Sequence, residues 1–251
     1  MLSELTPLEL GNARVERAGS TTRLVIANTG ERGYSDAQLF DYAGRRRSEF
    51  TCRAPLRMTV RAWASHDADS LRGTMGFGFW NQPIMPGQAL PRLPRAIWFF
   101  FGSRPSNMAL AMDVPGHGWK AAVLDATRLP FLLLLPGAPL GFLLMRRPAM
   151  YRRLWPLAQW AVGVSEKLID IDLRSPHRYQ LDWLPNAARF YVDDEMILQS
   201  PYAPRGSLGF VTWIDNQYAV VTPQGQIGMG LMAIPGEQWL ALEDLRVEAL
   251  K

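Results

Sequence analysis

Two aspartates in the second half of the chain have the spacing of an acid–base pair. Asp170 and Asp172 lie in the segment Glu166–Asp172, and on an extended strand their carboxylates would share one face. Two carboxylates on one face can act as a general acid and a general base. Exposed strand edges also carry such pairs, so we favour an exposed edge and keep both residues as catalytic candidates.

A second group of residues combines aromatic rings with polar side chains. Trp213, Asp215 and Asn216 follow an apolar run, and Trp80 and Asn81 close another one. Ring stacking together with amide and carboxylate hydrogen bonds is the mixture that a carbohydrate site uses. We therefore predict ligand contacts for these five residues, although a hairpin turn has the same composition. Asp215 is also a catalytic candidate.

A histidine in a glycine-rich loop could transfer protons near neutral pH. His117 lies between two glycines in Pro115–Trp119, and histidine is the side chain that ordinarily titrates in this range. Glycine and proline also dominate ordinary turns, so a turn is the favoured interpretation. Trp119 is added to the candidates for ligand contact. The acidic segment 193–195 is interpreted as a hairpin turn.

The composition excludes several other kinds of site. Cys52 is the single cysteine and cannot form an intramolecular disulfide, and the three histidines do not have the spacing of a zinc centre. No phosphate-binding loop, dinucleotide fingerprint, nucleophile elbow or HExxH motif occurs. The net charge is +4, but the basic window is apolar, so we expect no nucleic-acid partner. With no signal-like start, we expect a cytoplasmic location.

Most of the chain is typical of short strands separated by turn residues. Leu56–Ala64 alternates apolar and polar residues, and Met75–Asn81 alternates glycine with bulky residues. Further strands are predicted at Ala96–Gly102, Asn107–Asp113 and Leu168–Leu173, and a weak helix or a loop at Asp36–Phe50. About a dozen such segments favour an all-β sandwich or barrel.

Residues 126–165 contain no acidic residue and five arginines. Prolines interrupt the apolar run Leu129–Met145, so we do not expect a spanning helix. We predict a helical, apolar insertion at 126–167, with Pro148–Val164 as its main helix. It is interpreted as a buried insertion, as a proline-bent hairpin or, less favoured, as a wedge in a membrane interface. The wedge would use Arg146, Arg147, Tyr151, Arg152, Arg153, Trp155 and Trp160.

Three segments resemble a known family. SPHRYQLDWLPNAARFYVDDEMI (Ser175–Ile197) resembles a strand pair of concanavalin A-like jelly rolls, especially the family-16 glycoside hydrolases. GTMGFGFWN (Gly73–Asn81) resembles the strand that enters their ligand cleft, and ALEDLRVEAL resembles their last strand. The resemblance covers roughly Leu56–Ala249, without the insertion at 126–166, and implies one concanavalin A-like jelly-roll β-sandwich over residues 1–251. It concerns the fold more than the chemistry.

The segment that should carry this family's catalytic row has no carboxylate. In the family, a Glu-x-Asp-x-(x)-Glu strand supplies a nucleophile and an acid/base. Here the corresponding segment is Arg95–Ser103, with Trp98 and Phe100 on one face and three apolar residues on the other. An apolar strand cannot supply a nucleophile or a proton. We therefore do not transfer the hydrolytic mechanism, and we add Trp98 and Phe100 to the ligand-binding candidates.

Three hypotheses of function follow. The first is a ligand-binding protein with a carbohydrate-type cleft and without the family's hydrolysis. The second is binding or conversion of an apolar, lipid-like or isoprenoid-like molecule, with residues 129–160 as a lid or as a foot on the inner face of the membrane. The third is a glycoside hydrolase with relocated carboxylates at Asp170, Asp172 or Asp215.

No cofactor is expected from the motifs. The family's last strand sometimes contributes to a structural calcium site, and Asp244 is the residue in this place. One aspartate is little support, because calcium needs six or more oxygen ligands.

Overall fold

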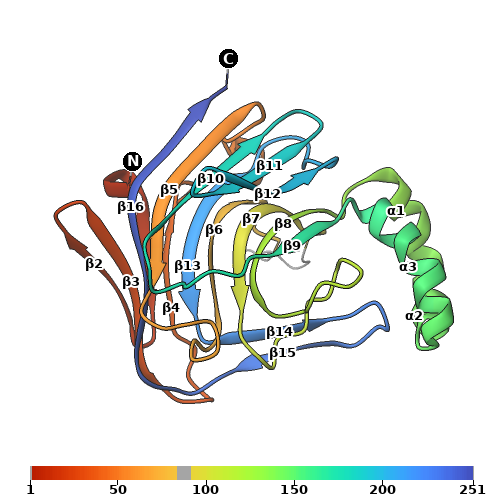
Figure 1. Ribbon diagram of the computed structural model, residues 1–251, viewed down its shortest axis with the longest axis horizontal. Helices are drawn as coiled ribbons and strands as arrows, with labels where there is room; N and C mark the ends of the chain where they lie inside the picture. Colours follow the sequence, from red (N-terminus) through yellow and green to blue (C-terminus); the bar gives the residue numbers. More distant parts are fainter. Residues whose placement is uncertain (1, 84–91, 251) are drawn as a thin grey trace.

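Two seven-stranded antiparallel sheets lie face to face in the computed structural model, which describes residues 2–83 and 92–250 (Figure 1). Sheet I has the order β1 (Thr6–Leu10), β4 (Asp36–Phe40), β13 (Gly209–Asp215), β6 (Thr74–Trp80), β7 (Arg95–Gly102), β8 (Gly118–Asp125) and β9 (Ser165–Leu168). Sheet II has the order β12 (Glu195–Ser200), β11 (Ala188–Val192), β10 (His177–Trp183), β5 (Leu56–Ala64), β16 (Ile234–Ala249), β3 (Thr21–Thr29) and β2 (Ala13–Ala18). The predicted all-β sandwich is confirmed.

Strict alternation of side chains builds the core between the sheets. On β7, Ile97, Phe99 and Phe101 point inward and are 0–1% exposed, and they meet aromatic residues of sheet II. The ring of Phe99 lies 5.0 Å from that of Tyr179 on β10 and 5.3 Å from that of Phe190 on β11, measured between centroids. Because the side-chain period of a strand is two, the intervening residues of β7 must lie on the opposite face of sheet I.

Some elements differ from the sequence-based expectations. Asp36–Phe50 begins with strand β4 rather than a helix, because its alternating residues Ala37 and Leu39 are core-facing; only Arg47–Glu49 forms a 3-10 turn. Asn107–Asp113 contains a single bridge residue instead of a strand. The strand expected at Leu168–Leu173 is wrong: among these residues only Leu168, the last residue of β9, lies in a strand.

The predicted helical insertion is present between β8 and β9. It contains α1 (Leu129–Leu134), a 3-10 turn (Leu135–Gly137), α2 (Ala138–Met145) and α3 (Pro148–Val162). We call these elements the arm, because Figure 1 shows them projecting from the sandwich. A separate hairpin, β14 (Gln217–Val221) and β15 (Ile227–Leu231), extends from the end of β13 toward the arm.

The alternation along β7 predicts different costs for two adjacent substitutions. Phe99→Ala should lower the free energy of unfolding by about 3–5 kcal/mol, because it leaves a cavity between the sheets. Trp98→Ala should cost less, because that side chain is half-exposed on the other face. Urea unfolding of both variants measures the difference, and equal costs would contradict the assignment of faces.

Candidate functional site

Aromatic rings cover the outer face of sheet I, which is the face turned away from sheet II. Trp80 on β6, Trp98 and Phe100 on β7 and Trp213 on β13 belong to one apolar cluster there. Glycines on β6 make room for them: a Cβ at Gly76 would lie 2.8 Å from the ring of Trp213. The alternating glycines of the sequence therefore form the surface on which the indoles lie.

The three indoles are close enough to form a continuous aromatic surface. The rings of Trp80 and Trp213 are nearly parallel, at 7°, with centroids 6.5 Å apart. Trp98 lies 5.3 Å from Trp213 and 6.1 Å from Trp80 between centroids. Trp80 and Trp98 are half-buried, whereas Trp213 and Phe100 are 9% and 8% exposed. The first two are therefore the rings best placed to contact a ligand.

Hydrogen bonds from two of the indole nitrogens fix their rings. Trp80 Nε1 donates to the Tyr42 hydroxyl at 2.7 Å, and Trp213 Nε1 donates to Thr74 Oγ1 at 2.9 Å. Tyr42 also accepts a bond from Gln38, which lies on the same face of β4. With these N–H groups occupied, the free binding capacity of Trp80 is mainly its ring.

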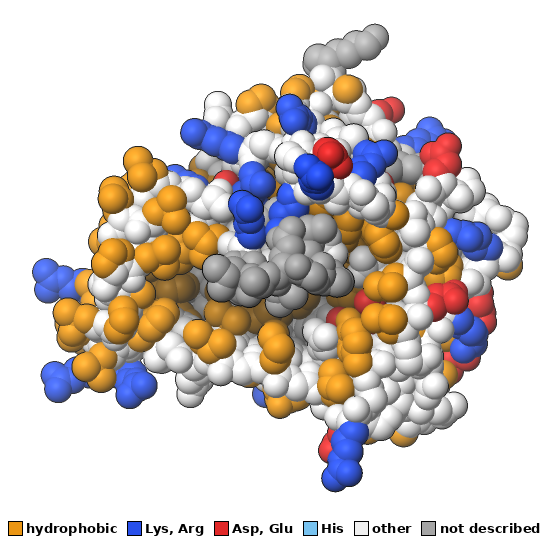
Figure 2. Space-filling model, turned by 180° about the vertical axis from the view of Figure 1, so that it is seen from behind, with side chains coloured by type: hydrophobic (Ala, Val, Ile, Leu, Met, Phe, Trp, Pro, Cys, Tyr) orange, Lys and Arg blue, Asp and Glu red, His pale blue; other side chains and the backbone are white. Residues whose placement is uncertain are grey.

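Two loops pack against the edge of the aromatic cluster. Tyr42 and Phe50 come from the connection after β4, with their ring centroids 4.8 Å apart, and Met108 comes from the loop after β7. Figure 2 shows the molecule hollowed between the arm and the body of the sandwich, with apolar side chains on the walls of the hollow. The outer face of sheet I is thus partly covered and apolar.

Two buried carboxyl groups lie side by side at one end of this face. Asp36 on β4 pairs directly with Asp215 on β13, and they are 4% and 7% exposed. Asp215 Oδ1 accepts hydrogen bonds from the hydroxyl and N–H of Thr74 and from the N–H of Gln217. Asp36 Oδ1 has no hydrogen-bond partner within the described part of the chain. Burial of two acids together disfavours their charged forms.

The pKa values of these two carboxyl groups are shifted upward. Burial raises the pKa of Asp36 to about 8, the neighbouring Asp215 adds to the rise, and a hydrogen bond from Tyr34 opposes it. Burial also raises the pKa of Asp215 to about 7, against the hydrogen bonds from Thr74 and Gln217. Near neutral pH the pair therefore holds at least part of one proton.

A buried ion pair lies at the other end of the same face. Lys120 on β8 and Glu166 on β9 are joined at 3.1 Å, and their side chains are 1% and 4% exposed. Lys120 Nζ also donates to the carbonyls of Met108 and Pro115, and Glu166 accepts from the N–H of Ala111. Burial raises the pKa of Glu166, while Lys120 opposes the rise. The pair ties the loop after β7 to the sheet.

The structure corrects three of the predicted ligand-binding residues. Trp119 faces the core between the sheets and is 3% exposed, because odd-numbered residues of β8 point inward. Asn81 is 3% exposed, and its amide bonds to the carbonyl of Leu93 and the N–H of Arg95. Asn216 is fully buried and its side chain holds three backbone groups, so it stabilises the chain rather than facing a ligand.

The remaining catalytic candidates do not converge on one site. Asp170 and Asp172 are exposed in the connection after β9, and the side chain of Arg174 binds Asp172 and lowers its pKa. His117 is half-buried in the turn before β8, where burial and the charges of Arg104 and Lys120 lower its pKa. The predicted turn at 193–195 is confirmed, with Asp193 and Asp194 at positive φ between β11 and β12.

Most of the residues predicted to contact a membrane are exposed on the arm. Arg146, Arg147, Arg152 and Arg153 are exposed, as is Trp160, while Tyr151 is half-buried. Trp155 is a correction: it is 8% exposed and its Nε1 donates to the carbonyl of Leu110, so it anchors α3 to the sandwich. Among the described helices, none has the length and apolar character required to cross a membrane.

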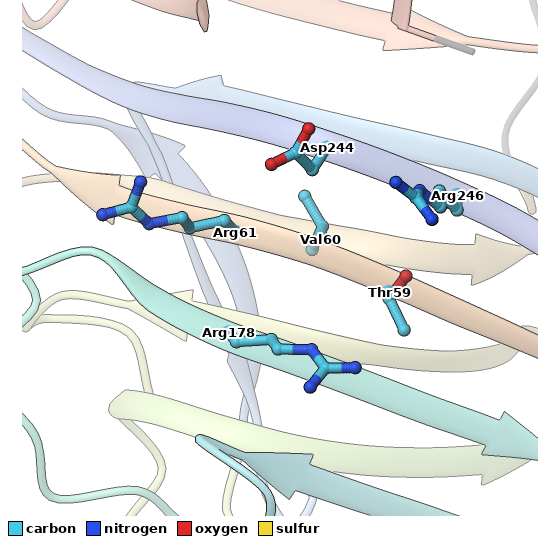
Figure 3. A pocket seen from close by; sticks show the side chains of 6 residues that line it. All are labelled: Thr59, Val60, Arg61, Arg178, Asp244 and Arg246. Atoms are coloured by element: carbon cyan, nitrogen blue, oxygen red, sulfur yellow. The ribbon is translucent and has the colours of Figure 1, made fainter. Parts of the chain in front are cut away.

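The outward face of sheet II contains a hollow of about 280 Å³ (Figure 3). It forms where β16 bulges between Glu243 and Arg246, and Asp244 takes a positive φ there. Asp244 shares the hollow with Arg61, Arg178 and Arg246. Three arginines beside one carboxylate do not fit the oxygen-rich site that calcium needs, which corrects the calcium alternative. Within residues 2–83 and 92–250 no cluster of three or more His, Cys, Asp or Glu could hold a metal ion.

Comparison with solved structures identifies the architecture. An endo-β-galactosidase from Clostridium perfringens that releases GlcNAcα1-4Gal matches with a TM-score of 0.55 and 14% identity, over 98% of this chain and 57% of that one. The chain has a concanavalin A-like fold. A Bacillus licheniformis β-glucanase matches at TM-score 0.48 and 11% identity, over 99% and 94% of the two chains. A sialidase matches at TM-score 0.46 and 7% identity, over 100% of this chain and 17% of its own.

Identities this low concern the concanavalin A-like fold and do not transfer an activity. No protein-family model matches the sequence, and a search of curated proteins finds no significant match.

The buried acid pair predicts a pH dependence of stability. A pKa that is raised in the folded state means that the folded chain binds more protons than the unfolded chain, so stability should fall as the pH rises from about 4 toward 8. Each such proton contributes up to about 1.4 kcal/mol per pH unit. Asp36→Asn should flatten this decline in thermal unfolding scans, whereas Asp170→Asn, at an exposed position, should leave it unchanged. A decline that persists fully in Asp36→Asn would contradict the assignment.

The buried ion pair predicts a strong asymmetry between single and double substitutions. Lys120→Met should cost about 3–5 kcal/mol, because it leaves Glu166 buried without its cation. Lys120→Met combined with Glu166→Leu should recover most of that loss in urea unfolding. If the double variant is no more stable than the single one, the two side chains do not act as a pair.

Proposed function

We propose that the protein binds carbohydrate on the outer face of sheet I, with Trp80 and Trp98 as the stacking surface. The observation that carries this proposal is the aromatic cluster: three indoles lie within 5.3–6.5 Å of one another, and Trp80 belongs to the segment that resembles the strand entering the family's ligand cleft. The apolar face of a sugar ring packs well on such rings, while their rims remain accessible to polar groups.

The galactosidase that shares this fold acts on a carbohydrate by its name, which supports the same ligand class. The rest of its chain has no counterpart here, because this chain spans 57% of it. The substrate of that enzyme is therefore not carried over.

The same geometry supports binding without the family's hydrolysis. A glycosidase presents two carboxyl groups about 5–9.5 Å apart to the bond that it cleaves. On β7 the outer-face positions hold Trp98 and Phe100 instead. Of the carboxyl groups described on this face, Asp36 and Asp215 are buried next to each other, and Glu166 is bound to Lys120. None of the three is presented to a bound sugar.

An apolar ligand is the second candidate. Met108, Phe50 and the half-buried Phe40 surround the indoles, so the cluster would also accept a lipid-like or isoprenoid-like molecule, with the arm as a lid. Carbohydrate is preferred because the half-buried indoles Trp80 and Trp98 offer rings on which a sugar can stack, and because the galactosidase of the same fold acts on a carbohydrate by its name.

A glycan array followed by calorimetry with the best oligosaccharide tests the proposal. Trp98→Ala should weaken binding at least about tenfold, because it removes a stacking surface. Trp63→Ala is the matched control, since Trp63 is a half-buried indole on the outward face of sheet II, beside Arg61. It should leave the affinity unchanged.

Three results would contradict the proposal. One is the absence of any glycan that binds, accompanied by thermal stabilisation from a lipid screen, which would favour the apolar ligand. Another is an equal loss in both tryptophan variants. The third is release of reducing sugar from β-linked glycans that disappears in Asp170→Asn, Asp172→Asn or Asp215→Asn, which would restore a hydrolase with relocated carboxylates.

A further inference from the structure

Exposed apolar side chains are concentrated in two segments of the chain. Among the described residues, twelve of the fifteen large hydrophobic side chains that are exposed belong to the arm or to the hairpin β14–β15. Leu133 on α1 is 72% exposed, and Leu140 and Leu143 on α2 are also exposed. An apolar area of this extent is unusual on a soluble surface and typically marks a contact with another molecule or a membrane.

The hairpin contributes one face of its two strands. Val221 pairs with Ile227 and Ala219 pairs with Met229, so these four side chains lie on the same face. Ile227 and Met229 are 77% and 74% exposed. The outer half of the hairpin is thus apolar although no core covers it.

The arm and the hairpin are neighbours in space, although more than fifty residues separate them in the sequence. A Cβ placed on Gly225, in the turn between β14 and β15, would lie 2.9 Å from the Cβ of Phe142 on α2. Figure 1 shows the tip of the hairpin beside this helix. The two exposed apolar sets therefore adjoin, and we call them together the arm–hairpin surface.

The arm is anchored to the sandwich by a different set of side chains. Trp155 donates to the carbonyl of Leu110, and Val162 packs in a small cluster with Ala111 and Ala126. These contacts use the inner side of α3 and leave Leu157 and Trp160 exposed, at 53% and 48%. The exposed leucines of α1 and α2 are therefore not among the side chains that attach the arm to the sandwich.

The charge of the arm–hairpin surface has one sign. Residues 127–164 contain five arginines and no acidic residue, and residues 216–236 contain no charged residue. Figure 2 shows blue side chains at the outer edge of the arm, around the orange area. Burial and the charge of Asp113 raise the pKa of Tyr151 on α3.

We propose that the arm–hairpin surface binds an anionic lipid bilayer. Leucines enter the acyl boundary, and the arginines at the rim pair with phosphate and other anionic headgroups. The guanidinium of Arg128 lies 5.8 Å from the ring centroid of Trp160. Tryptophan is typical of the interface between the acyl chains and the headgroups, because its indole has an apolar ring and a polar N–H.

A second copy of the chain fits this surface less well. A symmetric dimer through the same patch would bring two arginine rims together with no acidic partner in the arm, and like charges at close range repel. A bilayer supplies the missing negative charge together with the apolar layer. The inference does not depend on carbohydrate binding, because it uses none of the residues of the aromatic cluster.

Vesicle flotation of the full chain tests this proposal. The vesicles are phosphatidylcholine alone, or phosphatidylcholine with about 30% phosphatidylglycerol. The wild-type protein should float with the anionic vesicles and much less with the neutral ones, and added salt should weaken the association.

Variants separate the parts of the surface. Leu133→Glu with Leu140→Glu should weaken binding to anionic vesicles at least about tenfold, because charges would enter the acyl boundary. Ile227→Ser with Met229→Ser should weaken it severalfold. The fourfold variant Arg146→Gln, Arg147→Gln, Arg152→Gln and Arg153→Gln should abolish the preference for anionic vesicles.

A matched control uses exposed apolar residues elsewhere. Leu10→Glu with Met196→Glu changes side chains that are 39% and 49% exposed on β1 and β12, and should float like the wild type. Thermal unfolding of every variant verifies folding. Calorimetry with a soluble oligosaccharide should give unchanged affinity in Leu133→Glu/Leu140→Glu, which separates this proposal from the carbohydrate site.

Three results would overturn the proposal: no flotation of the wild-type protein with either vesicle, an equal loss in the control variant, or hairpin and arm variants that float like the wild type. Concentration-dependent dimers in sedimentation, abolished by Leu133→Glu/Leu140→Glu in a protein that does not float, would assign the surface to a second copy instead.

Discussion

The packing of alternate β7 side chains between the two sheets is the constraint on which the rest of the structure depends. The side chains of Ile97, Phe99 and Phe101 fill the space between the sheets. Their burial fixes the register of β7 against its neighbouring strands β6 and β8. Because side chains alternate along a strand, Trp98 and Phe100 must then lie on the outer face of sheet I. The chemistry that this face can perform is therefore set by what the core requires.

A second packed layer has formed on a face that a sandwich of this kind can leave to solvent. The indoles are supported by glycines beneath them and by Tyr42 and Phe50 at their edge. Polar groups trapped under such a layer need partners, since an unpaired buried charge is costly. Lys120 forms an ion pair with Glu166. Burial and the neighbouring carboxyl group raise the pKa of Asp36, which favours a shared proton over two adjacent negative charges. These pairings stabilise the buried polar groups of this face.

The sequence was sufficient for the features that depend on local patterns. Alternation located β5 at the predicted bounds, β6 and β7 within a residue, and the turn at Asp193–Asp194. It also located the helical insertion, whose composition differs from the strands around it. Features that depend on remote partners were missed or misplaced. The sequence does not show that Asp36 pairs with Asp215 across two strands. It also does not show that the side chain of Asn216 is hydrogen-bonded to backbone groups of two other segments. Trp119 could have been placed in the core by extending the alternation of β8 from Lys120 to Val123.

The arm is inserted between two paired residues of neighbouring strands, because Val123 on β8 pairs with Ser165 on β9. The length of the chain between those two residues does not enter the register of any other strand pair, and closing a longer connection adds little entropic cost. Diverging sequences could thus gain, lose or exchange this appendage while every ladder of the sandwich is kept. The connection between Val123 and Ser165 is therefore a suitable place to insert a segment from another protein.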